Sequence, residues 1–211
     1  TSYSGIIGDG RYTVRITDES GKIDINMASP LILKNLLVNL GVRPEDAETI
    51  VDSIMDWKDP DDLHRLHGAE SDYYRSLPHP YVAKDANFTT LEELILVKGM
   101  TPEILYGGGE KKGIIDFLTI NSKRSVININ AAPKEVLMAI PGMSSEIADG
   151  IISYRESKEI KSLQEVRGLL GEGATLMLPF VSTGGSNIFT IDAVGFKGSE
   201  KKGFSIRATV M

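Results

Sequence analysis

The chain has 211 residues, of which 41% are apolar and 25% are charged, so it is long enough to bury a sizeable core. Its formal net charge of −6 argues against a general nucleic-acid binder, because affinity for phosphate backbones comes from a surplus of lysine and arginine. The absence of cysteine excludes a disulfide framework, a thiolate zinc site and a cysteine nucleophile.

The first 27 residues predict a β-hairpin. Apolar and polar side chains alternate over residues 12–17 and again over residues 22–26, and Gly21 lies in the turn signal between the two runs. Alternation of this kind is typical of a strand with one buried face, and two such runs around a glycine turn indicate a hairpin. The start of the chain is therefore predicted to be β-structure.

A second hairpin is predicted at the other end of the chain. Residues 188–193 and 204–210 alternate in the same way, and residues 197–203 form the connection between them. An isolated two-stranded hairpin is only marginally stable in water. We therefore expect the two terminal hairpins to pair into one four-stranded antiparallel sheet.

The middle of the chain predicts a series of short helices. Each start is indicated by a proline or by a side chain that can accept a hydrogen bond from the first helical turn. The predicted starts are Pro30, Pro44, Thr90, Pro133, Ser144 or Ser145, and Ser162. The expected fold is α+β, with a discontinuous sheet domain of residues 1–29 and 184–211 and a large inserted helical domain of residues 30–183.

The helical part contains an internal repeat. Residues 23–30 and residues 127–133 share an Ile-x-Ile-Asn pattern that ends in proline, and each copy precedes a short apolar helix and a glycine, Gly41 or Gly142. This order indicates helix-hairpin-helix units, whose backbone N–H groups can bind nucleic-acid phosphates. Glu146, at the start of the next helix, would repel phosphate. A structural role is favoured, and a helix-hairpin-helix nucleic-acid-binding protein is the alternative function.

An acidic stretch occupies residues 56–62 and continues at residues 70–72. Hard cations such as calcium take about six to eight oxygen ligands, several of them carboxylates, on a loop that folds around the ion. The stretch lacks the ligand order of an EF-hand. Two interpretations stay open on spacing alone. One is a cation site; the other is a solvated acidic loop whose charges pair with Lys58, His64, Arg65 and His67.

The sequence indicates no catalytic centre. The three histidines, His64, His67 and His79, lie close together, but no further histidine or cysteine completes a transition-metal site. There is no phosphate-binding glycine loop and no glycine-flanked serine elbow. We therefore predict that the protein is not an enzyme. A hydrolase with a transition metal in the Asp/His loop is the weaker catalytic alternative.

Five segments, which occur in the same order, resemble a known family. They are residues 18–26, 56–62, 68–74, 91–100 and 127–132. They are similar to the Asp-Glu-x-Gly-x-Ile-Asn-Leu-Asn, Asp-Trp-x-Asp, Gly-Ala-Glu-Asp-Asp-Tyr-Tyr, Glu-Leu-x-x-Val-Lys-Gly-Met and Val-Asn-Ile-Asn-Thr-Ala segments of general secretion pathway protein K. This family comprises minor pseudopilins of the type II secretion system. Five ordered segments are far more specific than any one of them.

The resemblance implies an architecture and a function. The expected architecture is a pilin-like sheet interrupted by a large helical insertion. The family also has an N-terminal hydrophobic helix, absent from these residues, which anchors it in the inner membrane and leaves the folded part on the periplasmic side. The implied partners are minor pseudopilins I and J, in a complex that caps the pseudopilus tip, and no nucleic acid. The bulky helical domain fits only at a filament end.

The resemblance also implies calcium binding. Carried over to this sequence, the implied ligands are Asp59, Asp61, Asp62, Glu70 and Asp72. This chain departs from the family pattern at Ser71, where the family has aspartate. We expect this departure to reduce the number of ions that the loop holds.

Overall fold

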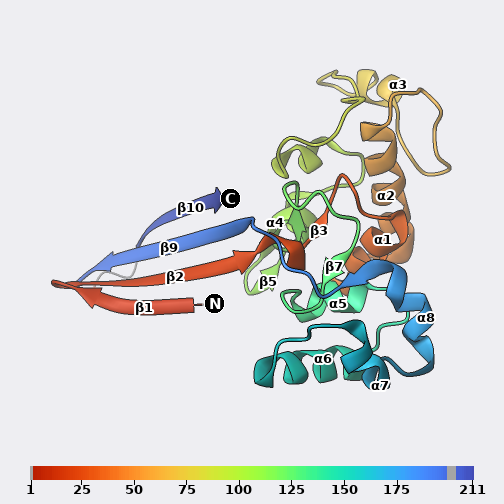
Figure 1. The fold of residues 1–211 in the computed structure, drawn as a ribbon. Coiled ribbons are helices and arrows are strands. Elements are labelled where there is room, and N and C mark those ends of the chain that lie inside the picture. The colour runs from red at the N-terminus through yellow and green to blue at the C-terminus, as the bar shows by residue number, and fades with distance from the viewer. Residues whose placement is uncertain (1, 199–202) are drawn as a thin grey trace.

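The computed structural model describes residues 2–198 and 203–211. Figure 1 shows a long sheet that projects from one side of a helical body. Residues 199–202 of the predicted C-terminal turn lie outside the described residues. In the described part of the chain, no helix is long and apolar enough to cross a membrane.

The sheet is built from both ends of the chain. Its strands are β1 (Ser2–Ile7), β2 (Gly10–Asp18), β9 (Phe189–Lys197) and β10 (Phe204–Val210), in the order β1-β2-β9-β10. All three pairings are antiparallel, and β2 pairs with β9 without a break from Gly10 opposite Lys197 to Asp18 opposite Phe189. The predicted α+β fold, with a sheet made from terminal hairpins, is confirmed.

The strands of the N-terminal hairpin differ from the prediction. Residues 10–15 of β2 pair with the preceding strand β1 around a turn at Gly8, whose φ of 60° suits glycine. The second predicted strand instead shortens to β3 (Ile23–Asp24), which is buried and pairs in parallel with β6 (Leu118–Thr119). Period-2 alternation identifies a strand but not its partner, so the prediction paired the wrong segments.

Gly21 allows the chain to pass close to the helical body after β2. A Cβ at Gly21 would lie 2.5 Å from the carbonyl carbon of Ala131, so the backbone approaches the helical body more closely than any side chain allows. A 3₁₀ turn, η1 (Glu19–Gly21), begins there, and Asp18 caps it by accepting a hydrogen bond from the Ser20 N–H. The chain thus passes directly from β2 into the body.

The helical body consists of short elements. The helices are α1 (Pro30–Asn39), α2 (Pro44–Lys58), α3 (Ser71–Arg75), α4 (Pro102–Tyr106), α5 (Lys134–Ala139), α6 (Ser145–Ser157), α7 (Arg167–Leu170) and α8 (Ala174–Met177). The further 3₁₀ turns are η2 (Glu92–Leu96), η3 (Ile114–Phe117), η4 (Leu163–Val166), η5 (Gly171–Gly173) and η6 (Leu178–Phe180). The short strands are β4 (Gly107–Gly108), β5 (Lys111–Lys112), β7 (Ile127–Asn128) and β8 (Val181–Ser182).

Most predicted helix starts agree with the structure. Pro30 and Pro44 begin α1 and α2, and the Ser144 hydroxyl caps α6 by accepting a hydrogen bond from the Ile147 N–H. Thr90 leads only into the 3₁₀ turn η2, not into an α-helix. The Glu93 carboxylate accepts hydrogen bonds from the backbone N–H groups of Thr89 and Thr90. The predicted capping residues therefore stabilise a 3₁₀ turn instead of the start of an α-helix.

The predicted repeat is also a structural repeat. Asp24 accepts a hydrogen bond from the Asn26 N–H at 3.0 Å, and Asn128 accepts the equivalent bond from the Asn130 N–H at 3.0 Å. The helices that follow, α1 with α2 and α5 with α6, are each joined at a glycine of positive φ. Helix α1 packs against both α2 and α5, which places the two hairpins around one core. The domain boundaries at residues 29/30 and 183/184 stay a prediction.

Candidate cation site and surfaces

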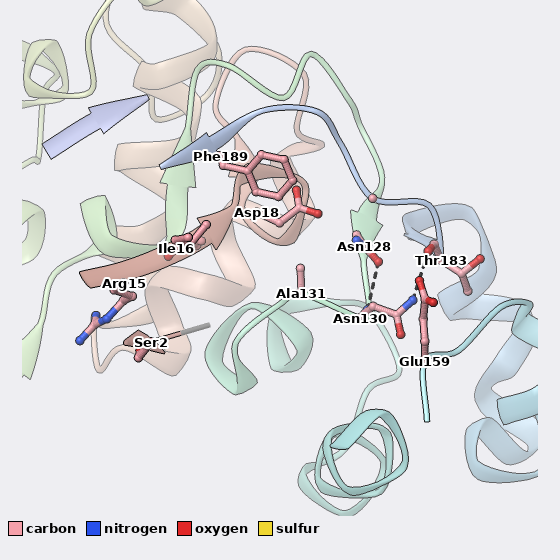
Figure 2. Close-up of a pocket in the computed structure, with 12 residues that line it drawn as sticks. Ser2, Arg15, Ile16, Asp18, Asn128, Asn130, Ala131, Glu159, Thr183 and Phe189 are labelled. Carbon is pink, nitrogen blue, oxygen red and sulfur yellow. Dashed lines mark hydrogen bonds between the residues drawn. The ribbon is translucent and has the colours of Figure 1, made fainter. Parts of the chain in front are cut away.

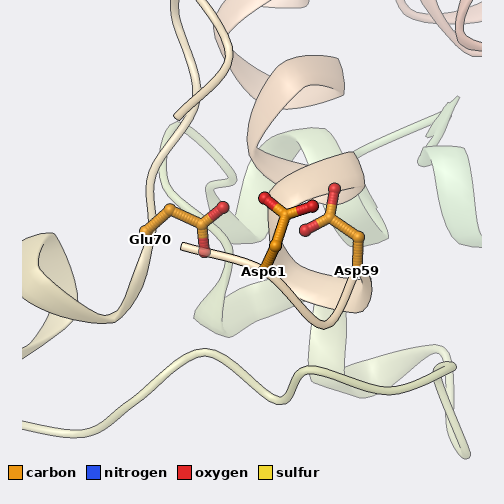
Figure 3. Close-up of side chains that lie close together, drawn as sticks. All are labelled: Asp59, Asp61 and Glu70. Atoms are coloured by element: carbon orange, nitrogen blue, oxygen red, sulfur yellow. The ribbon is translucent and has the colours of Figure 1, made fainter. Parts of the chain in front are cut away.

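The acidic loop after α2 brings three carboxylates together. Helix α2 ends at Lys58, and the chain returns to α3 at Ser71. Figure 3 shows Asp59, Asp61 and Glu70 on the facing sides of this loop. One carboxylate oxygen from each lies within 4.8 Å of the other two. This arrangement places three hard oxygen ligands around a common point.

The buried oxygens of this cluster lack partners. Glu70 is only 1% exposed, and among the described residues neither of its carboxylate oxygens has a hydrogen-bond partner. One oxygen of Asp59 is unpaired in the same way. Burial, followed by the charges of Asp56 and Asp59, raises the pKa of Glu70 to about 7. Because unpaired buried carboxylates are costly, a cation at this point would satisfy them.

Arg65 neutralises part of the same cluster. One nitrogen, Nη1, lies 2.6 Å from an oxygen of the fully buried Asp56 and 2.5 Å from an oxygen of Asp59. The loop can close on Asp56 only because residue 68 is glycine. A Cβ on Gly68 would lie 1.9 Å from the second Asp56 oxygen. Asp56 and Arg65 thus shape the loop, while Glu70 and Asp61 are left without a cationic partner in this part of it.

The structure does not bring Asp62 and Asp72 into the cluster. Asp62 is exposed, and Asp72 lies 3.0 Å from His64 on the exposed surface. The set of five ligands therefore stays a prediction, of which three members share one site. The donor set of three carboxylates still suits a hard cation such as calcium, which completes its shell with water and carbonyl oxygens.

The alternative interpretation, a solvated loop whose acidic charges pair with nearby basic residues, explains only some of the contacts in the loop. Arg65 does pair with the loop, and His67 lies 3.8 Å from Glu48. Lys58, however, donates to the carbonyl oxygens of Ile25 and Asn26 and is drawn away from the acidic loop. The two carboxylate oxygens of Glu70 therefore gain no partner from these residues.

The sheet presents a continuous apolar face. Strand registers place the following residues on this one side: Tyr3, Ile7, Tyr12, Val14, Ile16, Phe189, Ile191, Ala193, Phe204, Ile206, Ala208 and Val210. We call this the apolar sheet face. Figure 1 shows no helix of the described chain lying over the sheet. Phe204 is 85% exposed and Ile206 is 72% exposed. Large apolar side chains that are exposed side by side are typical of a surface that binds another molecule or segment.

The glycine turn of the second helix hairpin is not open to a phosphate. The side chain of Leu176 lies 3.3 Å from the position that a Cβ on Gly142 would occupy. The Ser144 hydroxyl already accepts from the first turn of α6, and Glu146 adds a negative charge there. A phosphate would therefore meet an apolar cover and a carboxylate instead of free N–H groups.

A cavity of about 500 Å³ lies where the sheet meets the helical body (Figure 2). Its polar side chains are used for structure. Asn130 donates to the carbonyl oxygens of Ile160 and Thr183, and Asn128 donates to Ser20. Although burial opposes it, hydrogen bonds from Ser186 and Ser20 hold the pKa of Asp18 below its ordinary value. This network ties β2 to the body and carries no reactive group.

Comparisons with known proteins agree with this architecture. A profile for type II secretion system protein K matches residues 15–106, and a helix-hairpin-helix profile matches residues 122–176. A type II secretion system protein K of Pseudomonas aeruginosa is 27% identical over 154 residues, which are 66% of this chain and 44% of the relative. One of Pectobacterium carotovorum is 34% identical over 73 residues, which are 35% of this chain and 22% of the relative.

A solved structure shares the fold. The GspK-GspI-GspJ complex from enterotoxigenic Escherichia coli contains a chain that matches 99% of this chain and 77% of its own length. The TM-score is 0.75 and the sequence identity 18%, so the likeness concerns the fold. The chain spans between 22% and 44% of the length of the curated relatives it matches.

Proposed function

We propose that this chain, which belongs to the type II secretion system protein K family, is the periplasmic part of a minor pseudopilin that caps the pseudopilus tip. Its partners in this proposal are the minor pseudopilins I and J. The observation that carries it is the union of both chain ends in one sheet, with a helical body inserted between β2 and β9. The role is steric and requires no catalytic residue.

The helical body inserted between β2 and β9 explains why such a subunit would lie at the end of a filament. Residues 19–188 separate the two central strands, and they form a body at one end of the sheet (Figure 1). Subunits in a filament shaft stack closely, and a body of this size leaves no room for a further subunit on its side. A chain with this shape therefore stops a filament instead of extending it.

The apolar sheet face supports the membrane part of the proposal. A hydrophobic N-terminal helix, outside these residues, would cover this face and anchor the protein in the inner membrane before assembly. Burial of Phe204 and Ile206 alone would contribute about 1.5–3 kcal/mol each. A face that stays uncovered would promote aggregation.

We also propose that calcium binds at the acidic loop, held by Asp59, Asp61 and Glu70. The unpaired buried oxygens of Glu70 and Asp59 support this proposal. The exposed Asp62 and Asp72 are predicted ligands only if the loop rearranges around the ion. Bound calcium would join the end of α2 to the start of α3 and make this part of the body rigid.

The assembly proposal is tested by mixing the chain with the soluble parts of minor pseudopilins I and J. We expect a complex with one copy of each, detected by size-exclusion chromatography with light scattering. A matched variant, Tyr3→Ser with Ile7→Ser, removes exposed apolar side chains from the apolar sheet face and should still form the complex if assembly is specific. No complex at micromolar concentrations would refute the proposed function.

The helix-hairpin-helix match makes nucleic-acid binding the second candidate. Leu176 over the Gly142 turn and Glu146 at the start of α6 oppose it. We expect no DNA binding at physiological ionic strength. Retention of duplex DNA that weakens steeply as salt rises would favour this candidate instead.

A further inference from the structure

Strand β10 forms an open edge of the sheet. All seven of its residues, Phe204–Val210, are exposed, and only β9 pairs with it in the described part of the chain. Backbone N–H and C=O groups along the outer side of an edge strand point away from its one neighbour. The ladder can therefore continue only with another extended strand.

This edge carries none of the features that usually prevent strand addition. Natural edges are protected by proline, a β-bulge, an unpaired lysine or a very short strand. The register of β10 on β9 runs unbroken from Phe204 opposite Gly195 to Val210 opposite Phe189. The one charged residue of the strand, Arg207, is held 2.5 Å from Asp192 of β9.

The opposite edge is a weaker candidate. Strand β1 is shorter, with six residues, and it contains Gly5. Glycine weakens a strand because it has no side chain to pack. The Tyr12 side chain also lies over Gly5, with its hydroxyl oxygen 2.7 Å from the position of an added Cβ. The longer and glycine-free edge of β10 is the better template.

Charge argues that the added strand comes from a different protein. Full-length antiparallel pairing of β10 with a second copy would place Arg207 opposite Arg207 of that copy. Like charges directly opposite each other destabilise an antiparallel pair. Asp192 is already engaged and cannot neutralise a second guanidinium. A strand with an acidic or uncharged residue at this position avoids the conflict.

We propose that the β10 edge binds an extended strand of a partner subunit and so prolongs the sheet across the subunit boundary. The strand is about seven residues long, apolar at alternate positions, and acidic or uncharged opposite Arg207. Its apolar row continues the apolar sheet face past Phe204 and Ile206. This inference rests on the proposed assembly with minor pseudopilins I and J, and it assigns the contact to one strand.

Hydrogen exchange tests the proposal directly. The backbone amides of residues 204–210 are followed in the chain alone and in its mixture with the soluble parts of pseudopilins I and J. We expect exchange of the outward-facing amides to slow by about tenfold or more in the complex, because strand pairing gives each amide an acceptor.

A pair of matched variants gives a second readout. Thr13 of β2 and Ser205 of β10 lie in one cross-strand row, opposite either side of Val194. Ser205→Lys protects the edge, whereas Thr13→Lys adds the same charge to the same face away from it. We expect Ser205→Lys to weaken complex formation at least about fivefold and Thr13→Lys to change it less than about twofold.

The outcomes separate this inference from the proposed function. If the complex forms while the β10 amides exchange unchanged and Ser205→Lys binds normally, the edge inference is wrong and the assembly stands. If no complex forms with either partner, both are wrong. Slower exchange at residues 204–210, with selective weakening by Ser205→Lys, supports both.

Discussion

Neutralising Glu70 should stabilise the cation-free protein above neutral pH. Its pKa rises from 4.5 to about 7 in the folded state, mainly through burial. At about 1.4 kcal/mol for each pH unit, the ionised carboxylate costs on the order of 3 kcal/mol. Solvent around the exposed Asp62, one of the repelling charges, screens part of this cost, so we expect Glu70→Gln to raise the free energy of unfolding by about 2 kcal/mol at pH 8.

The pH dependence has a definite sign. Because the folded-state pKa of Glu70 lies above its unfolded value, the protonated form favours the folded state. The resulting stability is fully present below pH 4.5 and is lost as pH rises through about 7. Without a cation, Glu70→Gln and the parent chain should therefore differ little near pH 4 and diverge by pH 8.

The assay is urea unfolding in the presence of a chelator, followed by the fluorescence of Trp57, the only tryptophan. Trp57 is buried at the end of α2, with its ring centroid 5.1 Å from that of Tyr74. The exposed Glu156→Gln is the matched control and should show no such divergence. The reasoning fails if Glu70→Gln is less stable than the parent chain at pH 8 without a cation.

Calcium should make the parent chain more stable than Glu70→Gln, the reverse of their order without a cation. An ion that binds only the folded state, at about 100 times its dissociation constant, adds about 2.7 kcal/mol to the free energy of unfolding. The parent chain should gain this stability, and Glu70→Gln should gain clearly less because it loses a charged ligand. If calcium leaves the unfolding of the parent chain unchanged, the calcium proposal is wrong while the fold is unaffected.

Three further predictions follow from single positions. Gly68→Ala should destabilise the fold by about 2 kcal/mol or more in thermal unfolding, because its Cβ collides with Asp56, whereas Gly168→Ala meets no atom and serves as control. Hydrogen bonds from Lys84 and Thr89 outweigh burial and lower the pKa of Glu93 to about 2. Glu93→Gln should therefore cost stability at pH 7, and the cost should shrink as pH falls from 4.5 towards 2 in urea unfolding. Replacing Leu176 by glycine removes the side-chain atoms nearest the Gly142 turn, yet duplex DNA should still not bind in a filter assay, because Glu146 remains.

Several features of the acidic loop were recognisable before the fold was known, but its geometry was not. The stretch of aspartates and Gly68 indicate a loop, and spacing alone left a cation site and a solvated acidic loop as open alternatives. Which carboxylates meet depends on the path of the chain between α2 and α3. The path brings the carboxylates of Asp59, Asp61 and Glu70 together and leaves Asp62 and Asp72 out of the cluster. The sequence indicates Arg65 as a charge partner of the loop, and the structure shows that it pairs with the fully buried Asp56.

The sequence by itself determined most of the helix starts and three of the four strands of the terminal sheet, because periodicity and capping act over a few residues. It also determined that both chain ends are β-structure and that an internal repeat joins helices through Gly41 and Gly142. Only the tertiary structure decided which strands pair. Alternation specifies the buried side of a strand but not its neighbour, so residues 22–26 joined β6 in the body while β1 completed the sheet. The same long-range packing decided the membership of the carboxylate cluster and left the edge of β10 open.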